Sequence, residues 1–124
     1  MNKLFAILLL LTLAFSGEAQ TVKSDATLDK VLNAIINLKE VKARDAYVKK
    51  MTKGERHLKY IVDSEPTKLE PDYRINVGED NGDTIHSHFF FLVFPKSMQI
   101  KVVDEMSGKT MDLKTWRAQA TKIR

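Results

Sequence analysis

The feature that most constrains this chain is a change in the spacing of its apolar side chains at Gly54. Before Gly54, apolar residues recur every three or four positions, as they do along one face of an α-helix. After Gly54, they alternate with polar residues, as they do along a half-buried β-strand. Helices that come first and strands that follow predict an α+β domain, with the helices on one face of an antiparallel sheet.

The helical part covers residues 25–53. Apolar side chains from Leu28 to Leu38 have the spacing of an amphipathic helix. A second helical pattern runs over residues 41–53 and ends at Gly54, which is a common helix stop. The pattern leaves open one long helix or a helix pair with a bend near residues 39–40. The side chains expected to point inward from the second pattern are Val41, Tyr47, Val48 and Met51.

The part after Gly54 predicts a four-stranded antiparallel meander sheet. Asn81-Gly82 favours a tight type I′ hairpin, which needs positive φ at both central residues. Thr110–Asp112 is consistent with a brief edge pairing or with the lead-in to a short C-terminal helix over residues 113–120. Asp112 is the expected cap of that helix, and Trp116 either pins it to the sheet or forms the wall of a pocket. The four expected strands are residues 57–63, 73–77, 84–94 and 98–103.

The strand from Ile85 to Phe94 has two different faces. Its odd positions, from Ile85 to Val93, form the expected core face. Its even positions begin with two histidines and become apolar toward the end of the strand. Because helices can cover only one face of the sheet, the even face is either shielded by the C-terminal segment or open to a partner. The even face carries His86, His88, Phe90, Leu92 and Phe94.

The first nineteen residues follow the three-part pattern of a secretory signal peptide. A charged start at Met1–Lys3 precedes the apolar run Leu4–Phe15, and small residues lead to a cleavage site after Ala19. The apolar run is shorter than the roughly 20 residues of a membrane span. We therefore expect a signal peptide at 1–19 and a single exported domain at 20–124, periplasmic or extracellular, with no membrane span after cleavage. The chain has no cysteine, so it has no disulfide or cysteine-based zinc site.

Charge is segregated along a chain whose formal net charge is +4. Residues 39–59 carry eight positive and three negative side chains, residues 60–83 two and seven, and residues 84–124 seven and three. Nucleic-acid binding couples a basic surface to a recognisable module and stacking aromatics, and neither is visible here. The segregation indicates either solvated surfaces or a surface complementary to a protein partner or an anionic envelope component.

His86 and His88 are the one pair with the spacing of metal ligands. Residues i and i+2 of a strand share a face, and Asp83 or His57 would be needed as a third ligand. A metal site needs three or four converging groups, and this pattern supplies two. No Gly-x-Ser-x-Gly elbow or glycine-rich phosphate loop occurs in the sequence. The prediction is therefore a non-catalytic chain without a cofactor.

The order of helices and strands resembles two small secreted designs, the cystatin-like fold and the PepSY-like domain. The similarity lies in Tyr73–Val77, Asn81-Gly82 and Phe91–Ile100. The ending Leu113-Lys114-Thr115-Trp116-Arg117 is also similar to small exported bacterial proteins of uncharacterised function. Inhibitory cystatins carry a Gln-x-Val-x-Gly hairpin, which residues 74–78 lack, so the resemblance does not imply protease inhibition.

The sequence thus predicts an exported binding or interaction domain. Its site is expected on the uncovered sheet face, at His86, His88, Phe90 and Leu92. The expected partner is another protein or a small envelope ligand. The alternative hypothesis is a small periplasmic metal-binding protein or hydrolytic enzyme that uses His86 and His88.

Overall fold

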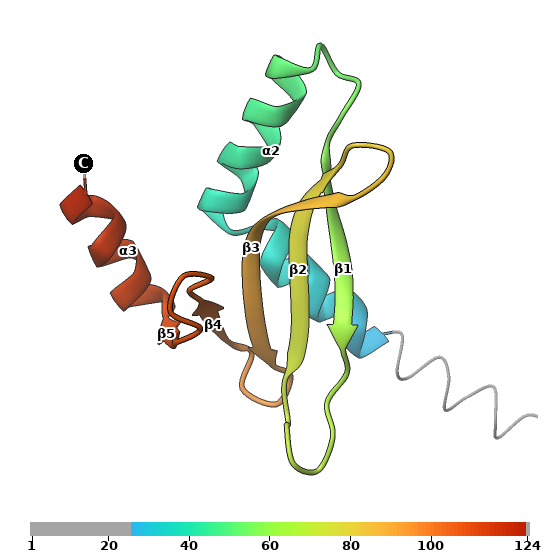
Figure 1. The fold of residues 1–124 in the computed structure, drawn as a ribbon. Helices are drawn as coiled ribbons and strands as arrows, with labels where there is room; N and C mark the ends of the chain where they lie inside the picture. The colour runs from blue at the N-terminus through green and yellow to red at the C-terminus, as the bar shows by residue number, and fades with distance from the viewer. Residues whose placement is uncertain (1–25, 124) are drawn as a thin grey trace, which may run out of the picture. The chain divides into compact units, whose positions relative to one another are not determined.

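The computed structural model describes residues 26–123 (Figure 1). The chain divides into two compact units, residues 1–30 and 31–124. In the first unit the described residues, 26–30, are helical. The predicted signal peptide at 1–19 lies outside the described residues. In the second unit, helical residues 31–36 precede α2 (Lys39–Met51), β1 (Leu58–Ser64), β2 (Tyr73–Asp80), β3 (Ile85–Phe94), β4 (Gln99–Val103), β5 (Thr110–Asp112) and α3 (Leu113–Ile123).

The fold is α+β, as predicted, and its strands form an antiparallel meander in the order β1-β2-β3-β4-β5. The sheet has five strands, so the expectation of four is wrong by one short edge strand. Met111 pairs with Val102 because the chain reverses tightly after β4. In that reversal the N–H of Gly108 donates to the carbonyl of Asp104, and Gly108 has a φ of +72°.

The helices before the sheet are two segments. The first ends at Ile36, and α2 begins at Lys39. Between them, Leu38 is extended, with φ −64° and ψ 135°, and its side chain is buried. Asn37 closes the preceding turn, because its backbone N–H and its side-chain Nδ2 both donate to the carbonyl of Asn33, at 3.0 and 2.8 Å. The break therefore lies just before the expected bend.

The core lies between the helices and one face of the sheet. In Figure 1 the helical residues 31–36 lie behind the sheet at β2. Their Val31 and Ile35 are fully buried, as are Ile75 and Val77 of β2 and Phe91 of β3. Deleting such side chains removes several kcal/mol of stability, so this layer holds the unit together. The other buried apolar residues are Leu38, Val41, Val48, Leu58, Tyr73, Leu92, Val93, Ile100 and Val102.

The inward direction expected for Tyr47 and Met51 is wrong, because both side chains are exposed. Val41 and Val48 set the buried face of α2. The next position on that face is Asp45, which turns toward the sheet and accepts the N–H of Leu58 on Oδ1 at 2.9 Å. Residues 47 and 51 fall on the flank of the helix instead.

The β2–β3 hairpin is not a type I′ turn. Gly82 has a φ of +104°, but the described non-glycine residues with positive φ are Lys53 and Met98, so Asn81 does not have it. Asn81 closes the loop differently. Its backbone N–H donates to the carbonyl of Thr84 at 3.2 Å, and its Oδ1 accepts the N–H of Thr84 at 3.1 Å. Side-chain bonding of this kind lets Asn hold a turn without positive φ of its own.

The C-terminal helix α3 begins as predicted. Asp112 caps it by accepting the N–H of Thr115 on Oδ1 at 2.7 Å. Arg117 ties the helix to α2 through Nε and Nη2, which donate to the two carboxylate oxygens of Glu40 at 2.8 and 3.0 Å. Among residues 26–123, no helix combines the length and the apolar character that a membrane span requires.

Candidate functional site

A β-bulge divides β3 near its middle. Val77 of β2 pairs with Phe89, but the next residue, Gly78, pairs with Ser87, so His88 has no partner in β2. Glycine is needed at position 78 because a Cβ there would lie 2.5 Å from the carbonyl oxygen of His86. The extra residue changes which side chains share a face on either side of the bulge.

The bulge separates the four predicted site residues. Phe90 and Leu92 pair with Asn76 and Arg74, on the face turned away from the helices. His86 pairs with Glu79 instead, two residues after Val77 and therefore on the helix-covered face. The expectation that one even face carries all four residues is wrong. The expected core face holds for Phe89, Phe91 and Val93 and fails at Ile85 and Ser87, which pair with Asp80 and Gly78.

The two histidines do lie close together. Their ring centroids are 5.1 Å apart, edge to face. His88 is mostly buried, with Nε2 3.4 Å from Oε2 of Glu79 but without a hydrogen bond to any described residue. His57, one of the two expected third ligands, lines a different cavity. Within residues 26–123, no group of three His, Cys, Asp or Glu side chains is placed to hold a metal ion.

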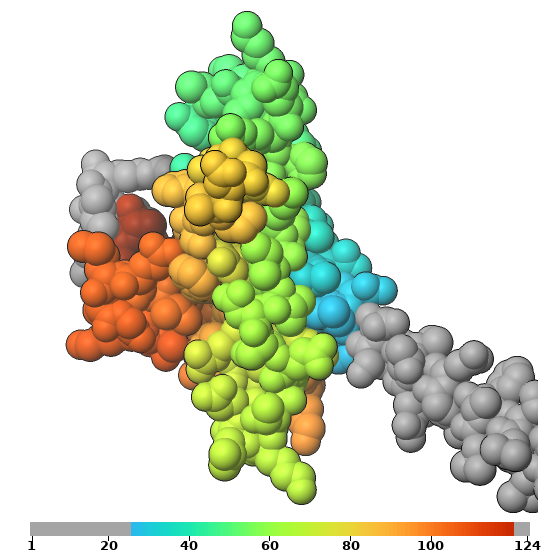
Figure 2. Space-filling view, turned by 45° about the vertical axis from the view of Figure 1, so that its right-hand side comes forward, coloured from blue at the N-terminus to red at the C-terminus, as the bar shows by residue number. Residues whose placement is uncertain are grey.

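The face turned away from the helices has no described helix over it. In Figure 2, the side chains of β1 and β2, in green and yellow, form the surface in front. Leu92 is nevertheless buried, because in the sheet it lies between Arg74 and Lys101. Long cationic side chains cover apolar neighbours with their aliphatic stems. This face is therefore less open around Leu92 than the sequence suggested.

Helix α3 packs against the other face. The Trp116 ring meets Phe89 and Phe91 edge to face, with centroid distances of 5.9 and 6.2 Å. Such contacts add to the stability gained from burial alone. The C-terminal helix therefore packs on the helix-covered face of the sheet and does not cover the opposite face.

The first half of β3 is a free strand edge. The pairing of β3 with β4 covers Phe91–Phe94 and ends there, so Ile85–Phe90 have β2 on one side and no described strand on the other. Alternate N–H and C=O groups of such an edge have no strand partner. Unpaired edges are templates for another strand, and proteins usually cover or blunt them.

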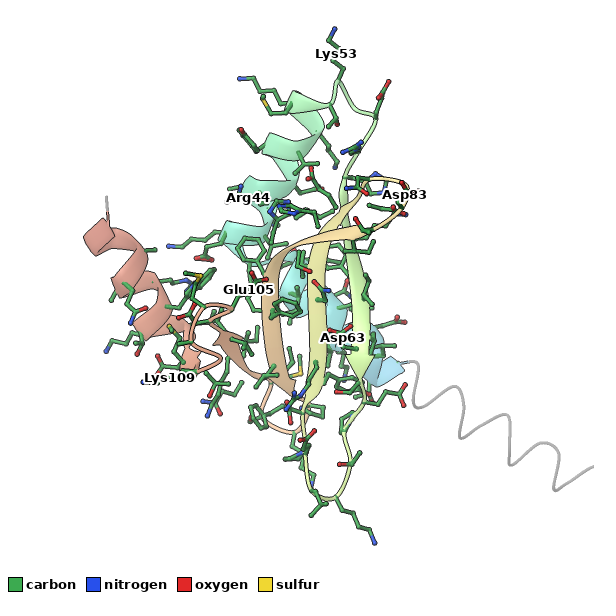
Figure 3. All side chains as sticks on the ribbon, viewed as in Figure 1. Arg44, Lys53, Asp63, Asp83, Glu105 and Lys109 are labelled. Carbon is green, nitrogen blue, oxygen red and sulfur yellow. The ribbon has the colours of Figure 1, made fainter. Side chains whose placement is uncertain are left out.

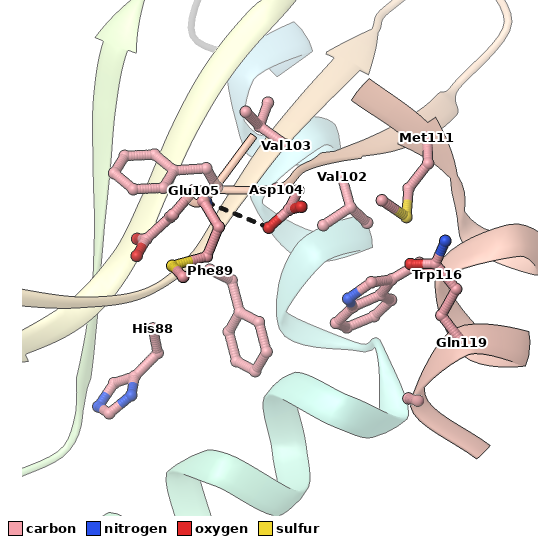
Figure 4. Close-up of a pocket in the computed structure, with 12 residues that line it drawn as sticks. His88, Phe89, Val102, Val103, Asp104, Glu105, Met111, Trp116 and Gln119 are labelled. Atoms are coloured by element: carbon pink, nitrogen blue, oxygen red, sulfur yellow. Dashed lines mark hydrogen bonds between the residues drawn. The ribbon is translucent and has the colours of Figure 1, made fainter. Parts of the chain in front are cut away.

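A groove of about 460 Å³ lies beside this edge, shown in Figure 4. One wall is β3, and the other consists of the end of β4, the β4–β5 turn, β5 and α3. Two of the predicted residues, His88 and Phe90, line the groove, and His86 and Leu92 do not. The sequence indicated Trp116 as a pocket wall, but the other wall residues carried no signal. The remaining lining residues are Phe89, Val102, Val103, Asp104, Glu105, Met106, Met111, Gln119 and Ala120.

The groove is negatively charged in a chain that is positive in total. Its lining contains the carboxylates of Asp104 and Glu105 and no lysine or arginine. Asp104 shapes the turn, accepting the N–H of Met106 at 3.2 Å and the hydroxyl of Ser107 at 2.9 Å. Glu105 is exposed and lies beside β3 in Figure 3. The groove thus offers aromatic walls, an unpaired backbone and one available carboxylate.

Comparisons with family models, curated proteins and solved structures found no match to this chain. The geometry of the groove is therefore the basis for inferring its function.

Proposed function

We propose that residues 20–124 form an exported, non-catalytic binding domain that takes an extended segment of a partner protein along the free edge of β3. The observation that carries this proposal is the unpaired edge at Ile85–Phe90 beside an aromatic groove. An added strand gains main-chain hydrogen bonds from the edge, and side-chain pockets give it specificity.

The side chains beside the edge suit such a segment. Successive residues of a strand point to opposite faces. Phe89 and Phe90 both line the groove, so an added strand meets an aromatic ring on each face. Trp116 extends the contact on the Phe89 side, and the exposed carboxylate of Glu105 favours a partner segment with a basic side chain.

Export rests on the pattern of residues 1–19 and is part of the proposal. We also propose the PepSY-like design over the cystatin-like one. Two helical segments separated at residues 37–38 precede the meander, and this order favours a helix pair over a single wrapped helix.

A defined peptide tests strand addition. The probe is a capped hexapeptide of alternating valine and threonine with one central lysine. Trp116 is the sole tryptophan, so its emission reports occupancy of the groove. We expect saturable binding tighter than about 1 mM, equivalent to about −4 kcal/mol. The same peptide with N-methylated backbone amides should not bind, because it cannot pair with the edge. Equal binding of the two peptides, or binding of neither, would contradict the proposal.

A matched pair of variants locates the binding. Met106 lines the groove and is 96% exposed, whereas Leu69 lies on the β1–β2 loop and is 94% exposed. Both M106E and L69E place a carboxylate at a solvent-exposed position, so neither should change stability by more than about 0.5 kcal/mol. M106E should change the affinity for the peptide, and L69E should not. Equal effects of the two variants would place the peptide elsewhere.

A further inference from the structure

Another cavity lies at the end of the sheet where the β1–β2 loop meets the β3–β4 turn, which Figure 1 shows side by side. Its volume is about 760 Å³, within the usual range for small-molecule sites. The ring of Phe94 and three prolines, Pro66, Pro71 and Pro95, form its apolar walls. Proline has a fixed φ, so these walls are conformationally restricted before any ligand arrives.

The polar part of this cavity is cationic. Lys68 and Lys96 line it together with Thr67, Ser97 and Gln99, and no carboxylate does. Both lysines are exposed, and neither makes an ion pair with a described residue. The cavity therefore pairs an apolar surface with two cations that lack a counter-charge from the described residues.

The loop carries three acidic residues, Glu65, Glu70 and Asp72, and none of them lines the cavity. Thr67 and Glu70 close the loop, with the N–H of Thr67 donating to the carbonyl of Glu70 at 2.7 Å and the N–H of Glu70 donating to Oγ1 of Thr67 at 3.0 Å. The Glu70 carboxylate lies 3.5 Å from Nη2 of Arg74, outside the cavity lining. Lys68, between them in sequence, lines the cavity.

We propose that this cavity binds an amphiphilic carboxylate of the fatty-acid class. The aliphatic chain packs on Phe94 and the prolines, and the carboxylate lies between Lys68 and Lys96. A cationic amphiphile would be repelled by both lysines, and a neutral one would leave them without a counter-charge. This site is separate from the strand groove and does not depend on the function proposed for it.

Calorimetry with dodecanoate below its micellar concentration tests this inference. Dodecyltrimethylammonium and dodecyl maltoside are the cationic and neutral comparators. We expect dodecanoate to bind at least tenfold more tightly than either. The inference is overturned if all three bind alike, or if dodecanoate does not bind with a Kd of about 1 mM or tighter.

A charge-reversal pair locates the site. The variant with K68E and K96E should lose at least tenfold in dodecanoate affinity. The variant with K53E and K109E makes the same change in net charge outside the cavity and should bind like the parent protein. Thermal unfolding of both variants checks that they are folded. Equal dodecanoate affinities of the two variants would contradict the proposed site. Unchanged binding of the strand peptide to the variant with K68E and K96E would show that the groove is independent of this cavity.

Discussion

The two halves of β3 have different surroundings although they belong to one strand. Phe91–Phe94 pair with β2 on one side and β4 on the other. Their Phe91, Leu92 and Val93 are buried. Ile85–Phe90 pair with β2 alone and contain the bulge at His88. The second half of the strand belongs to the core, and the first half has the free edge to which we assign the proposed interaction.

Two local features produce this difference. Gly78 lets the backbone of β3 approach β2 closely enough for an extra residue, and the turn at Asp104–Gly108 takes β4 away from the upper part of β3. Neither Gly78 nor this turn depends on the apolar character of the β3 side chains. A strand with apolar residues on both faces can therefore be central over one half and an edge over the other.

The largest contrast is expected between neighbouring phenylalanines. Phe91 is 1% exposed and touches Trp116, so F91A should lower the free energy of unfolding by about 3–5 kcal/mol. Phe90 is half-buried at the groove, and F90A should lower it by about 1 kcal/mol, near the centre of the distribution for point mutants. Urea titration of both variants measures the difference. Equal losses would mean that both halves of β3 belong to one core.

The next largest loss of stability is expected from a substitution at the bulge. G78A places a methyl group 2.5 Å from the carbonyl oxygen of His86, and the neighbouring strand must move. We expect a loss of about 1–3 kcal/mol, the usual range for overpacking. Amide exchange should speed up at residues 86–88 more than at 91–94. A variant with parent stability would show that the close approach at Gly78 is absent in solution.

The smallest change in stability is expected at the ion pair between Glu40 and Arg117, which holds α3, one wall of the groove, to α2. The hydrogen bond from Arg117 lowers the pKa of Glu40 below its ordinary value of 4.5. Because the folded pKa is the lower one, the stabilisation is present above the unfolded pKa and is lost as pH falls through the folded value. E40Q should lower stability by about 1 kcal/mol at pH 7.

The pH dependence of unfolding provides the control for that variant. At a pH below the lowered pKa of Glu40, where its carboxyl is protonated, E40Q and the parent protein should unfold with nearly the same free energy. A difference that persists unchanged at low pH would show that the pair does not supply this stabilisation.

Patterns among residues close in sequence predicted much of the fold. The period change at Gly54 predicted helices and then strands, and Asp112 was correctly predicted as a cap because its partner is only three residues away. Tyr47 and Met51 were misplaced because the phase of α2 depends on Val41, Val48 and the contact of Asp45 with β1. That contact joins residues thirteen apart and has no local signature.

The site was only partly predictable for the same reason. His88 and Phe90 were expected from the strand pattern and do line the groove. Their separation from His86 and Leu92 follows from a bulge whose cause, Gly78, lies on the neighbouring strand. The far wall comes from β5 and α3, which reach β3 only through the pairing of Met111 with Val102 and the packing of Trp116.

Amide hydrogen exchange along β3 tests the central claim most directly. In the free protein, alternate amides of Ile85–Phe90 should exchange rapidly, and the amides of Phe91–Val93 should be strongly protected. Adding the valine–threonine–lysine peptide should slow the first group and leave the second unchanged. Full protection of Ile85–Phe90 without peptide, or exchange there that the peptide does not alter, would contradict a free edge that receives a strand.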